Sequence, residues 1–131
     1  MTVIRPSAAL VRGTRAEQTL MRIQVGERDR HDGRPLYRSI VELLRTRGLS
    51  GATVTRCIAG FGASRSLHSE VSDVSALDLP VVVECVDSEA KIQSVLPDLD
   101  RMIRGGLITL ERATVILYRA HGGEAGPGGT S

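Results

Sequence analysis

The chain has 131 residues, 41% of them hydrophobic and 24% charged, which suits one compact domain with its own core rather than two. Seventeen basic and fifteen acidic residues leave a formal net charge of +2, and only two tyrosines and one phenylalanine could stack on bases. This composition gives no support for a nucleic-acid partner. The longest apolar run, residues 79–83, is much too short to span a membrane.

Both ends of the chain have the composition of tails. Residues 1–18 show no sustained hydrophobic period, and glycine dominates residues 121–131. We therefore expect a flexible N-terminal segment (1–18), a folded domain (19–120) and a disordered tail (121–131). Arg5 and Pro6 disfavour a signal peptide, and two cysteines without Cys-x-x-Cys spacing suit a reducing compartment. The expected location is the cytoplasm.

The first half of the domain predicts a strand, a turn and a helix. A short apolar stretch ends at Gly26 and predicts a strand, which residues 27–33 follow as a polar turn. From Pro35 onward, apolar residues recur at steps of three and four, as on the buried face of a helix. Pro35 suits the first turn of that helix, and Gly48 suits the left-handed position just past its end.

The middle of the chain predicts a second strand, a long loop and a third strand. Residues 52–59 are rich in β-branched side chains, which are typical of strands. Residues 61–78 are polar and aperiodic, and a loop of that length in a compact domain is usually functional or disordered. Residues 79–87 predict a third strand that is covered over much of its length.

The last part of the domain predicts a helix and a final strand. Asp87 or Ser88 is expected to cap the helix, whose apolar residues keep the helical step until Gly105-Gly106 end it. Pro97 lies inside that pattern and predicts a kink or a break. Residues 107–118 then form one strand, or two short strands around Glu111 and Arg112.

The predicted order is strand, helix, strand, strand, helix, strand. Each strand-helix-strand half then needs a right-handed crossover to return to one sheet. This is the α+β, ferredoxin-like βαββαβ sandwich, with both helices on one face of an antiparallel sheet. The other face must be solvated, polar or covered by another chain. The strands are more apolar than an open face requires, so the sequence favours an oligomer.

Several short stretches together resemble the PII-like family known as domain of unknown function 190, and more distantly the PII signalling proteins. The matching pieces are Gly26-Glu27, Pro35-Leu36-Tyr37, Gly48 to Val54, Gly60-Phe61-Gly62, Leu79-Pro80-Val81, Val86-Asp87, Lys91-Ile92 and Gly106 to Thr109. The resemblance implies a ferredoxin-like subunit in a PII-like homotrimer. Its three sheets would face inward, with ligand clefts between subunits.

The resemblance also implies ligand-binding positions, because PII proteins bind adenine nucleotides in those clefts. Thr53 matches a nucleotide-contacting position, and Gly60 and Gly62 match glycines at the base of the long T-loop. Gly105-Gly106 lies where PII proteins have their B-loop, without that loop's acidic residue and lysine. Arg119 corresponds to a phosphate-binding arginine near the C-terminus of PII proteins.

The residues themselves leave alternatives open at these positions. Gly60-Phe61-Gly62 either cradles a phosphate or ribose, or ends a strand that needs positive φ. Thr53 is otherwise a plain strand residue. Glu27 either orients a ligand or spans two subunits by a hydrogen bond, or is a solvated turn carboxylate. Arg56 needs a carboxylate, a phosphate or solvent at its guanidinium, and a structural ion pair is the first expectation.

The sequence therefore predicts a regulatory protein and not an enzyme, because no catalytic constellation is present. It would bind a small anionic metabolite, an adenine nucleotide first among them, as effector and without a resident cofactor. The ligand would order or release residues 61–78, which contact a partner such as a membrane transporter. No metal is expected, because His68 and Glu70 are too few ligands. The alternatives are a metal-responsive trimer like the divalent-cation tolerance proteins, and a small enzyme working in the cleft.

Overall fold

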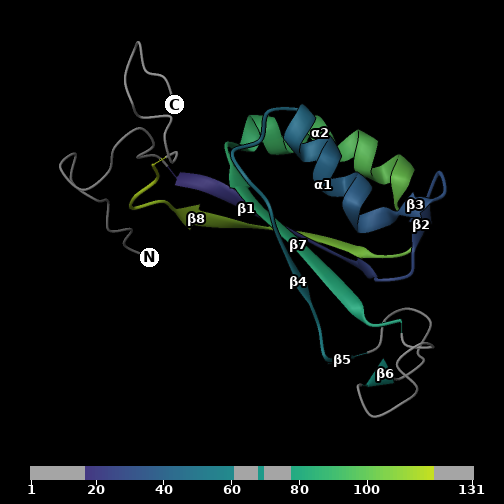
Figure 1. Cartoon of the computed structure of the whole chain (residues 1–131). Coiled ribbons are helices and arrows are strands. Elements are labelled where there is room, and N and C mark those ends of the chain that lie inside the picture. Colours follow the sequence, from purple (N-terminus) through teal and green to yellow (C-terminus); the bar gives the residue numbers. More distant parts are fainter. Residues whose placement is uncertain (1–16, 61–67, 70–77, 120–131) are drawn as a thin grey trace. The chain divides into compact units, whose positions relative to one another are not determined.

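The computed structural model describes residues 17–60, 68–69 and 78–119 of the chain (Figure 1). Thr19–Glu111 form one compact unit, and the residues that flank this range belong to a second. In the second unit, Arg112 lies 3.7 Å from the Glu17 carboxylate. The predicted tails, residues 1–18 and 121–131, lie almost wholly outside the described residues, and the first strand already begins at Glu17.

Four strands form the main sheet, in the order β4-β7-β1-β8. They are β1 (Glu17–Gly26), β4 (Thr53–Arg56), β7 (Pro80–Asp87) and β8 (Leu107–Thr114). β7 runs antiparallel to both of its neighbours, so β1 and β4 are parallel to each other. A parallel pair separated by one strand is what a crossover through a helix produces.

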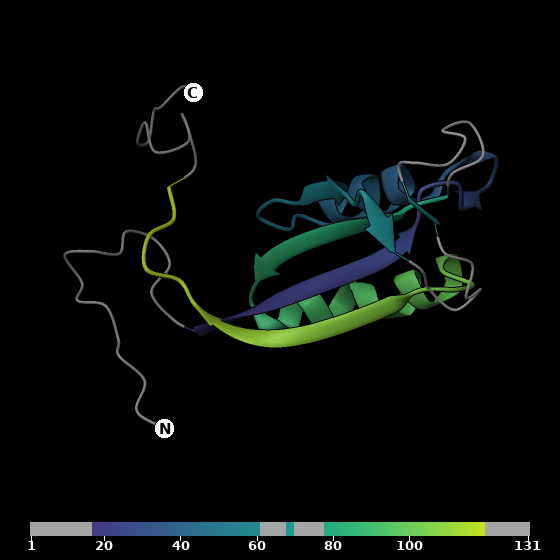
Figure 2. The same cartoon turned by 90° about the horizontal axis from the view of Figure 1, so that it is seen from below.

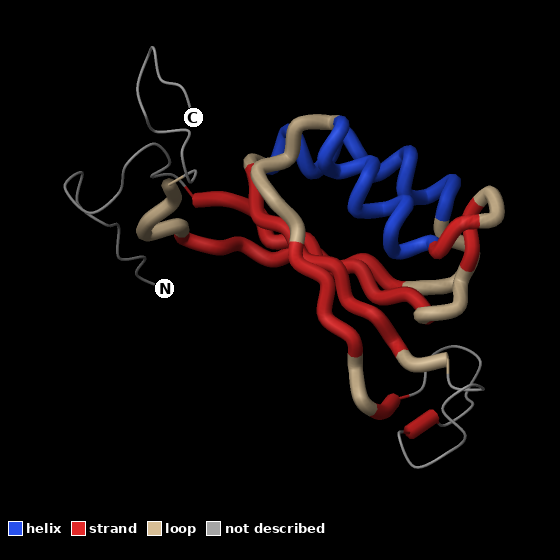
Figure 3. The backbone as a smooth tube through the Cα atoms, in the orientation of Figure 1, coloured by secondary structure: helices blue, strands red, loops and turns tan. Residues whose placement is uncertain are grey.

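Two helices cover one face of this sheet. α1 (Leu36–Thr46) connects β1 to β4, and α2 (Glu89–Met102) connects β7 to β8. Figure 3 shows both helices on the same side of the strands, and Figure 2 gives the view from below, with the strands in front of the helices. The α+β class and the ferredoxin-like βαββαβ order are thus confirmed.

The core lies between the helices and every second residue of the two central strands. Met21, Ile23 and Val25 of β1 are at most 3% exposed, and Val83 and Cys85 of β7 at most 4%. They pack against Leu36, Ile40 and Leu44 of α1, Leu49, and Ile92, Val95 and Leu99 of α2. Burial, and then the charge of Asp87, raise the pKa of the Cys85 thiol to about 11. Cys85 is therefore a core residue.

The ends of the helices follow from local chemistry. Ser88 is the N-cap of α2, since its side chain accepts a hydrogen bond of 3.3 Å from the Lys91 N–H. α2 runs through Pro97, so of the predicted kink or break the break is wrong, and the kink stays a prediction. Gly48 follows the C-cap of α1 with φ +82°, as expected for the left-handed position.

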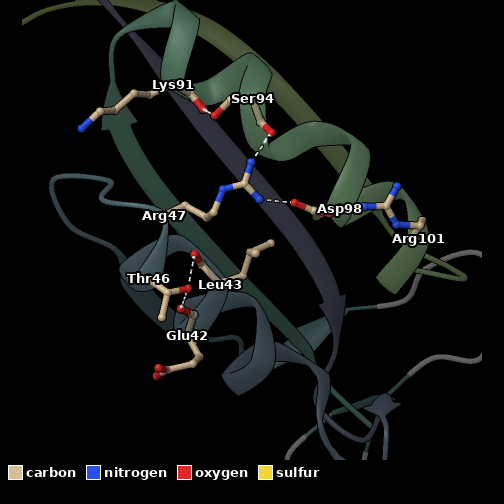
Figure 4. Close-up of polar contacts among 8 residues, drawn as sticks. All are labelled: Glu42, Leu43, Thr46, Arg47, Lys91, Ser94, Asp98 and Arg101. Carbon is tan, nitrogen blue, oxygen red and sulfur yellow. Dashed lines mark hydrogen bonds and ion pairs between the residues drawn. The ribbon is translucent and has the colours of Figure 1, made fainter.

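A polar contact ties the two helices together on their outer side (Figure 4). The Arg47 guanidinium, just past α1, donates to the Ser94 carbonyl at 2.8 Å and to the Asp98 carboxylate, both on α2. Arg101 also pairs with Asp98. The hydrogen bond from Arg47 and the two arginine charges lower the pKa of Asp98.

Three strands differ from the prediction. The polar segment 27–33 is not a simple turn, since β2 (Arg30–His31) and β3 (Arg34–Pro35) pair across Asp32-Gly33. Asp32 (φ +52°) and Gly33 (φ +78°) both have positive φ, which is the geometry of a tight two-residue hairpin. The last strand is single and ends at Thr114 rather than at residue 118.

The second predicted strand, residues 52–59, is interrupted. β4 ends at Arg56, and β5 (Ala59–Gly60) leaves the main sheet to pair with β6 (His68–Ser69). Between them, the Cys57 N–H donates to the Pro80 carbonyl at 3.0 Å, and Ile58 is 75% exposed. The predicted loop 61–78 therefore contributes one strand, β6, to a short ladder with β5, while most of it lies outside the described residues.

Candidate functional site

The candidate site lies at the end of the sheet where β1 and β4 finish and β7 begins. Gly26, the last residue of β1, pairs with Pro80, and Arg56, the last of β4, pairs with Val81. Beyond the ladder, the Glu27 N–H donates to the Leu79 carbonyl at 2.8 Å. Backbone bonds thus hold Glu27 and Arg56 at the same sheet end, although their sequence positions are far apart.

Glu27 and Arg56 form an ion pair at this end. Nη2 of Arg56 lies 2.7 Å from Oε2 of Glu27, and their side chains are 63% and 28% exposed. This confirms the carboxylate partner expected of Arg56. Within this chain, the Glu27 carboxylate is therefore paired, and it is not the solvated turn carboxylate that was one of the alternatives.

Two further carboxylates fix the turn after β1. Asp29 accepts a hydrogen bond of 2.9 Å from the Gly26 N–H, and Asp78 accepts one of 2.9 Å from the Arg28 N–H. A Cβ on Gly26 would lie 2.9 Å from an Asp78 carboxylate oxygen, so a larger residue there would have to displace that side chain. Asp78, which precedes β7, therefore holds the turn after β1 through its side chain.

Of the candidate segment Gly60-Phe61-Gly62, the structure describes Gly60. Its φ is +156°, and a Cβ would lie 3.3 Å from Cγ of Pro80, at the first residue of β7. Backbone conformation and this close approach therefore account for glycine without a ligand. Phe61 and Gly62, the other two residues of the predicted cradle, lie outside the described residues.

The remaining predicted site residues are spread over the fold. Thr53 is exposed at the start of β4, the end of the strand away from Arg56, and pairs with Glu84. A Cβ on Gly106 would lie 2.7 Å from the backbone oxygen of Gln24, which explains Gly106 by packing, whereas Gly105 is open. Arg119 is exposed and belongs to the second unit. In the compact unit, the structure brings Glu27, Gly60 and Gly106 to one sheet end and leaves Thr53 at the other.

Part of the motif that carries the family resemblance has a structural role. Ser50 donates to Asp87 through its N–H at 2.8 Å and to the Val86 carbonyl through its hydroxyl at 2.7 Å. Lys91 Nζ donates to the Gly48 carbonyl at 2.8 Å. These bonds join the segment after α1 to the start of α2, so the residues position β4 in the sheet.

No helix or strand of the described residues covers the face of the main sheet opposite the helices. This face carries the alternate residues of β1 and β7, where Leu20 pairs with Val86, Arg22 with Glu84 and Gln24 with Val82. All six are of intermediate exposure. Arg22 Nε donates to Glu84 at 2.7 Å, and Glu111 lies 4.0 Å from Arg22. The bond to Glu84 raises the pKa of Arg22.

In the described ranges, no three His, Cys, Asp or Glu side chains gather in a way that would hold a metal ion. None of the helices there combines the length and the apolar content that crossing a membrane requires. The side chain of His68 is not among those described.

Known structures share this fold. CPII from Thiomonas intermedia K12, a nitrogen regulatory PII-like protein solved with ADP, AMP and bicarbonate, superposes with a TM-score of 0.56. The match covers 77% of this chain and 90% of that one at 13% identity. A second CPII structure, with ADP and bicarbonate, gives a TM-score of 0.51 at 12% identity. At such identities the likeness establishes a PII-like fold.

Sequence relatives are closer. A UPF0166 protein of Aquifex aeolicus is 39% identical over 100 residues, which are 76% of this chain and 94% of the relative. A UPF0166 protein of Methanocaldococcus jannaschii is 37% identical over 92 residues, covering 70% of this chain and 84% of the relative. The profile of the family DUF190, described as "Uncharacterized ACR, COG1993", matches residues 18–115. The chain therefore belongs to the DUF190 family.

Proposed function

We propose that this protein is a PII-type regulator that binds a small anionic metabolite, first of all an adenine nucleotide, in clefts between copies of the subunit. Residues 61–78 change with the bound ligand and contact a partner protein, such as a membrane transporter. In this proposal the protein is cytoplasmic, and its ligand is an effector rather than a substrate. The PII-like fold and the nucleotides bound to CPII support the proposal.

One observation carries the proposal for this chain. The strand that leads into residues 61–78 ends beside a cationic side chain, because Arg56 closes β4 and Gly60 packs against Pro80 at the same sheet end. A guanidinium suits the phosphoryl oxygens of a nucleotide, and glycine lets backbone N–H groups approach a ligand. Because Glu27 is paired with Arg56, a ligand bound to Arg56 would also lie close to Glu27.

The uncovered sheet face supports the oligomer in the proposal. Leu20 and Val86 are cross-strand neighbours on this face, Val82 lies on it beyond Glu84, and Leu107 of β8 is 56% exposed. Apolar side chains on a sheet face gain free energy when a second sheet covers them. A homotrimer with its three sheets inward would cover this face and create the clefts. Thr53, Gly105-Gly106 and Arg119 are the proposed ligand contacts along those clefts, with Gly60, Phe61 and Gly62.

Calorimetric titration with ADP, AMP and ATP, with and without bicarbonate, tests the proposal. Thr53→Val should weaken nucleotide binding about tenfold, the loss of one hydrogen bond. Thr55→Val is the matched control, because Thr55 is also exposed and two residues along the same strand, opposite Val82. It should bind like the wild type. Absence of heat and of any thermal shift with all three nucleotides would reject the nucleotide-binding function.

A further inference from the structure

The ion pair between Arg56 and Glu27 can open without a change in the fold. The backbone of Glu27 is fixed by its bond to Leu79, and that of Arg56 by its pairing with Val81. Within the described ranges, Glu27 is the one polar partner of the Arg56 side chain, through a single contact of 2.7 Å. Rotation of the side chains is therefore enough to separate them.

The pair is also weak enough for a ligand to replace it. The Arg56 side chain is 63% exposed, so water competes for its charge, and an exposed pair holds its closed form by roughly twofold to fivefold. A guanidinium carries five N–H donors in a planar fork that fits two oxygens of one oxyanion. A phosphoryl dianion can accept hydrogen bonds from both arms of that fork, and it carries more negative charge than the Glu27 carboxylate.

We propose that Arg56 binds an oxyanion of the effector, and that Glu27 occupies the guanidinium as an internal competitor when no effector is bound. The inference rests on the proposed function and adds the group that binds the negative charge of the effector, the Arg56 guanidinium. Binding then releases the Glu27 carboxylate, which the ligand's own charge repels. Glu27 thus opposes binding of the anion, although its position makes it look like a ligand contact.

Titrations of ADP and of adenosine, which lacks the phosphates, test this assignment. Glu27→Gln should tighten ADP binding roughly twofold to fivefold, because the competitor is gone and the side chain keeps its shape. Arg56→Gln should weaken ADP binding at least tenfold, since a charge-assisted contact is lost. Both variants should bind adenosine like the wild type. Separate titrations with inorganic phosphate and with bicarbonate decide which oxyanion Arg56 prefers.

Glu42→Gln is the matched control. It removes the same negative charge from another exposed pair, that of Glu42 with Arg45 on α1, and should leave ADP binding unchanged. In the double variant lacking both Glu27 and Arg56 charges, the gain from Glu27→Gln should vanish, as the competitor has nothing left to occupy. A structural role alone would not produce this dependence.

The outcomes separate the two proposals. If the wild type binds ADP while Glu27→Gln and Arg56→Gln, folded as judged by circular dichroism, bind it equally well, the competitor is rejected and the regulatory function stands. A weaker ADP complex in Glu27→Gln would also reject it, because Glu27 would then be a ligand contact. If the wild type binds none of the titrants, the proposed function fails and the competitor with it.

Discussion

The two faces of the sheet differ in what the chain itself provides to cover them. On the helix side, Met21 and Ile23 of β1 are fully buried. On the other side, their neighbours Leu20 and Arg22 are of intermediate exposure, and an ion pair with Glu84 lies among apolar side chains. The helix-covered face is complete within one subunit, whereas the open face gains its cover, in our proposal, from other copies.

Truncation of β1 on the two faces should give the largest difference. Ile23→Ala removes a side chain that is 0% exposed and should lower the free energy of unfolding by about 2–5 kcal/mol. Leu20→Ala, on the open face, should cost about 1 kcal/mol or less in dilute protein. Urea unfolding at low concentration measures both. Equal losses would show that the open face is already packed within the subunit.

A charge on the open face should break the assembly without unfolding the subunit. Val82→Lys would place an ammonium group, with no partner, between sheets that we propose to be in contact, at a cost of several kcal/mol if it is buried. Sedimentation velocity should show dissociation to monomers with a normal circular dichroism spectrum. Thr55→Lys, beside Val82 on edge strand β4, tests whether the contact between sheets extends to β4. Dissociation of this variant would include β4 in the contact, and an unchanged sedimentation coefficient would leave β4 outside it. An unchanged sedimentation coefficient for Val82→Lys would mean that this face is wet.

The glycines before β8 should respond unequally to alanine. Gly106→Ala would bring a methyl group to 2.7 Å from the backbone oxygen of Gln24 and should destabilise the fold by about 1–3 kcal/mol. Gly105→Ala meets nothing within 4 Å and should change stability by about 0.5 kcal/mol or less. Thermal melts of the two variants compare them directly. A stable Gly106→Ala variant would remove the packing explanation and favour a ligand-binding one.

The two cysteines should react at different rates with a thiol reagent. Burial raises the pKa of Cys85 to about 11, so at pH 8 roughly one in a thousand of these thiols is ionised. Cys57 is partly exposed. Mass spectrometry after brief alkylation should find the label on Cys57, with Cys85 labelled only in denaturant. Rapid labelling of Cys85 in the native protein would contradict the packed core on the helix side.

Much of the fold could be predicted because periodicity reports burial. The helical step of Leu36, Ile40 and Leu44 records which side of α1 faces the core, and the apolar run of β7 is typical of a central strand. The hairpin at Asp32-Gly33 was missed because it buries no apolar side chain, and only its turn residues signal it. Pro97 did not break α2, because α2 also buries Val95 and Leu99 in the core.

The candidate site was harder to predict, since it depends on contacts between distant residues. Spacing alone could not show that Glu27 and Arg56 meet, although the cost of an unpaired guanidinium on a strand face did require a carboxylate, phosphate or water. For Gly60 and Gly106, a close neighbour explains the glycine that sequence patterns connect with ligands. A glycine motif therefore does not distinguish packing from binding.

Native mass spectrometry of the wild-type protein with ADP tests the central claim most directly, because one spectrum reports both the number of subunits and the bound nucleotide. The account predicts a trimer that carries ADP, with Val82→Lys appearing as a monomer without it. A wild-type monomer at micromolar concentration, or a trimer that retains no nucleotide at saturating ADP, would contradict it.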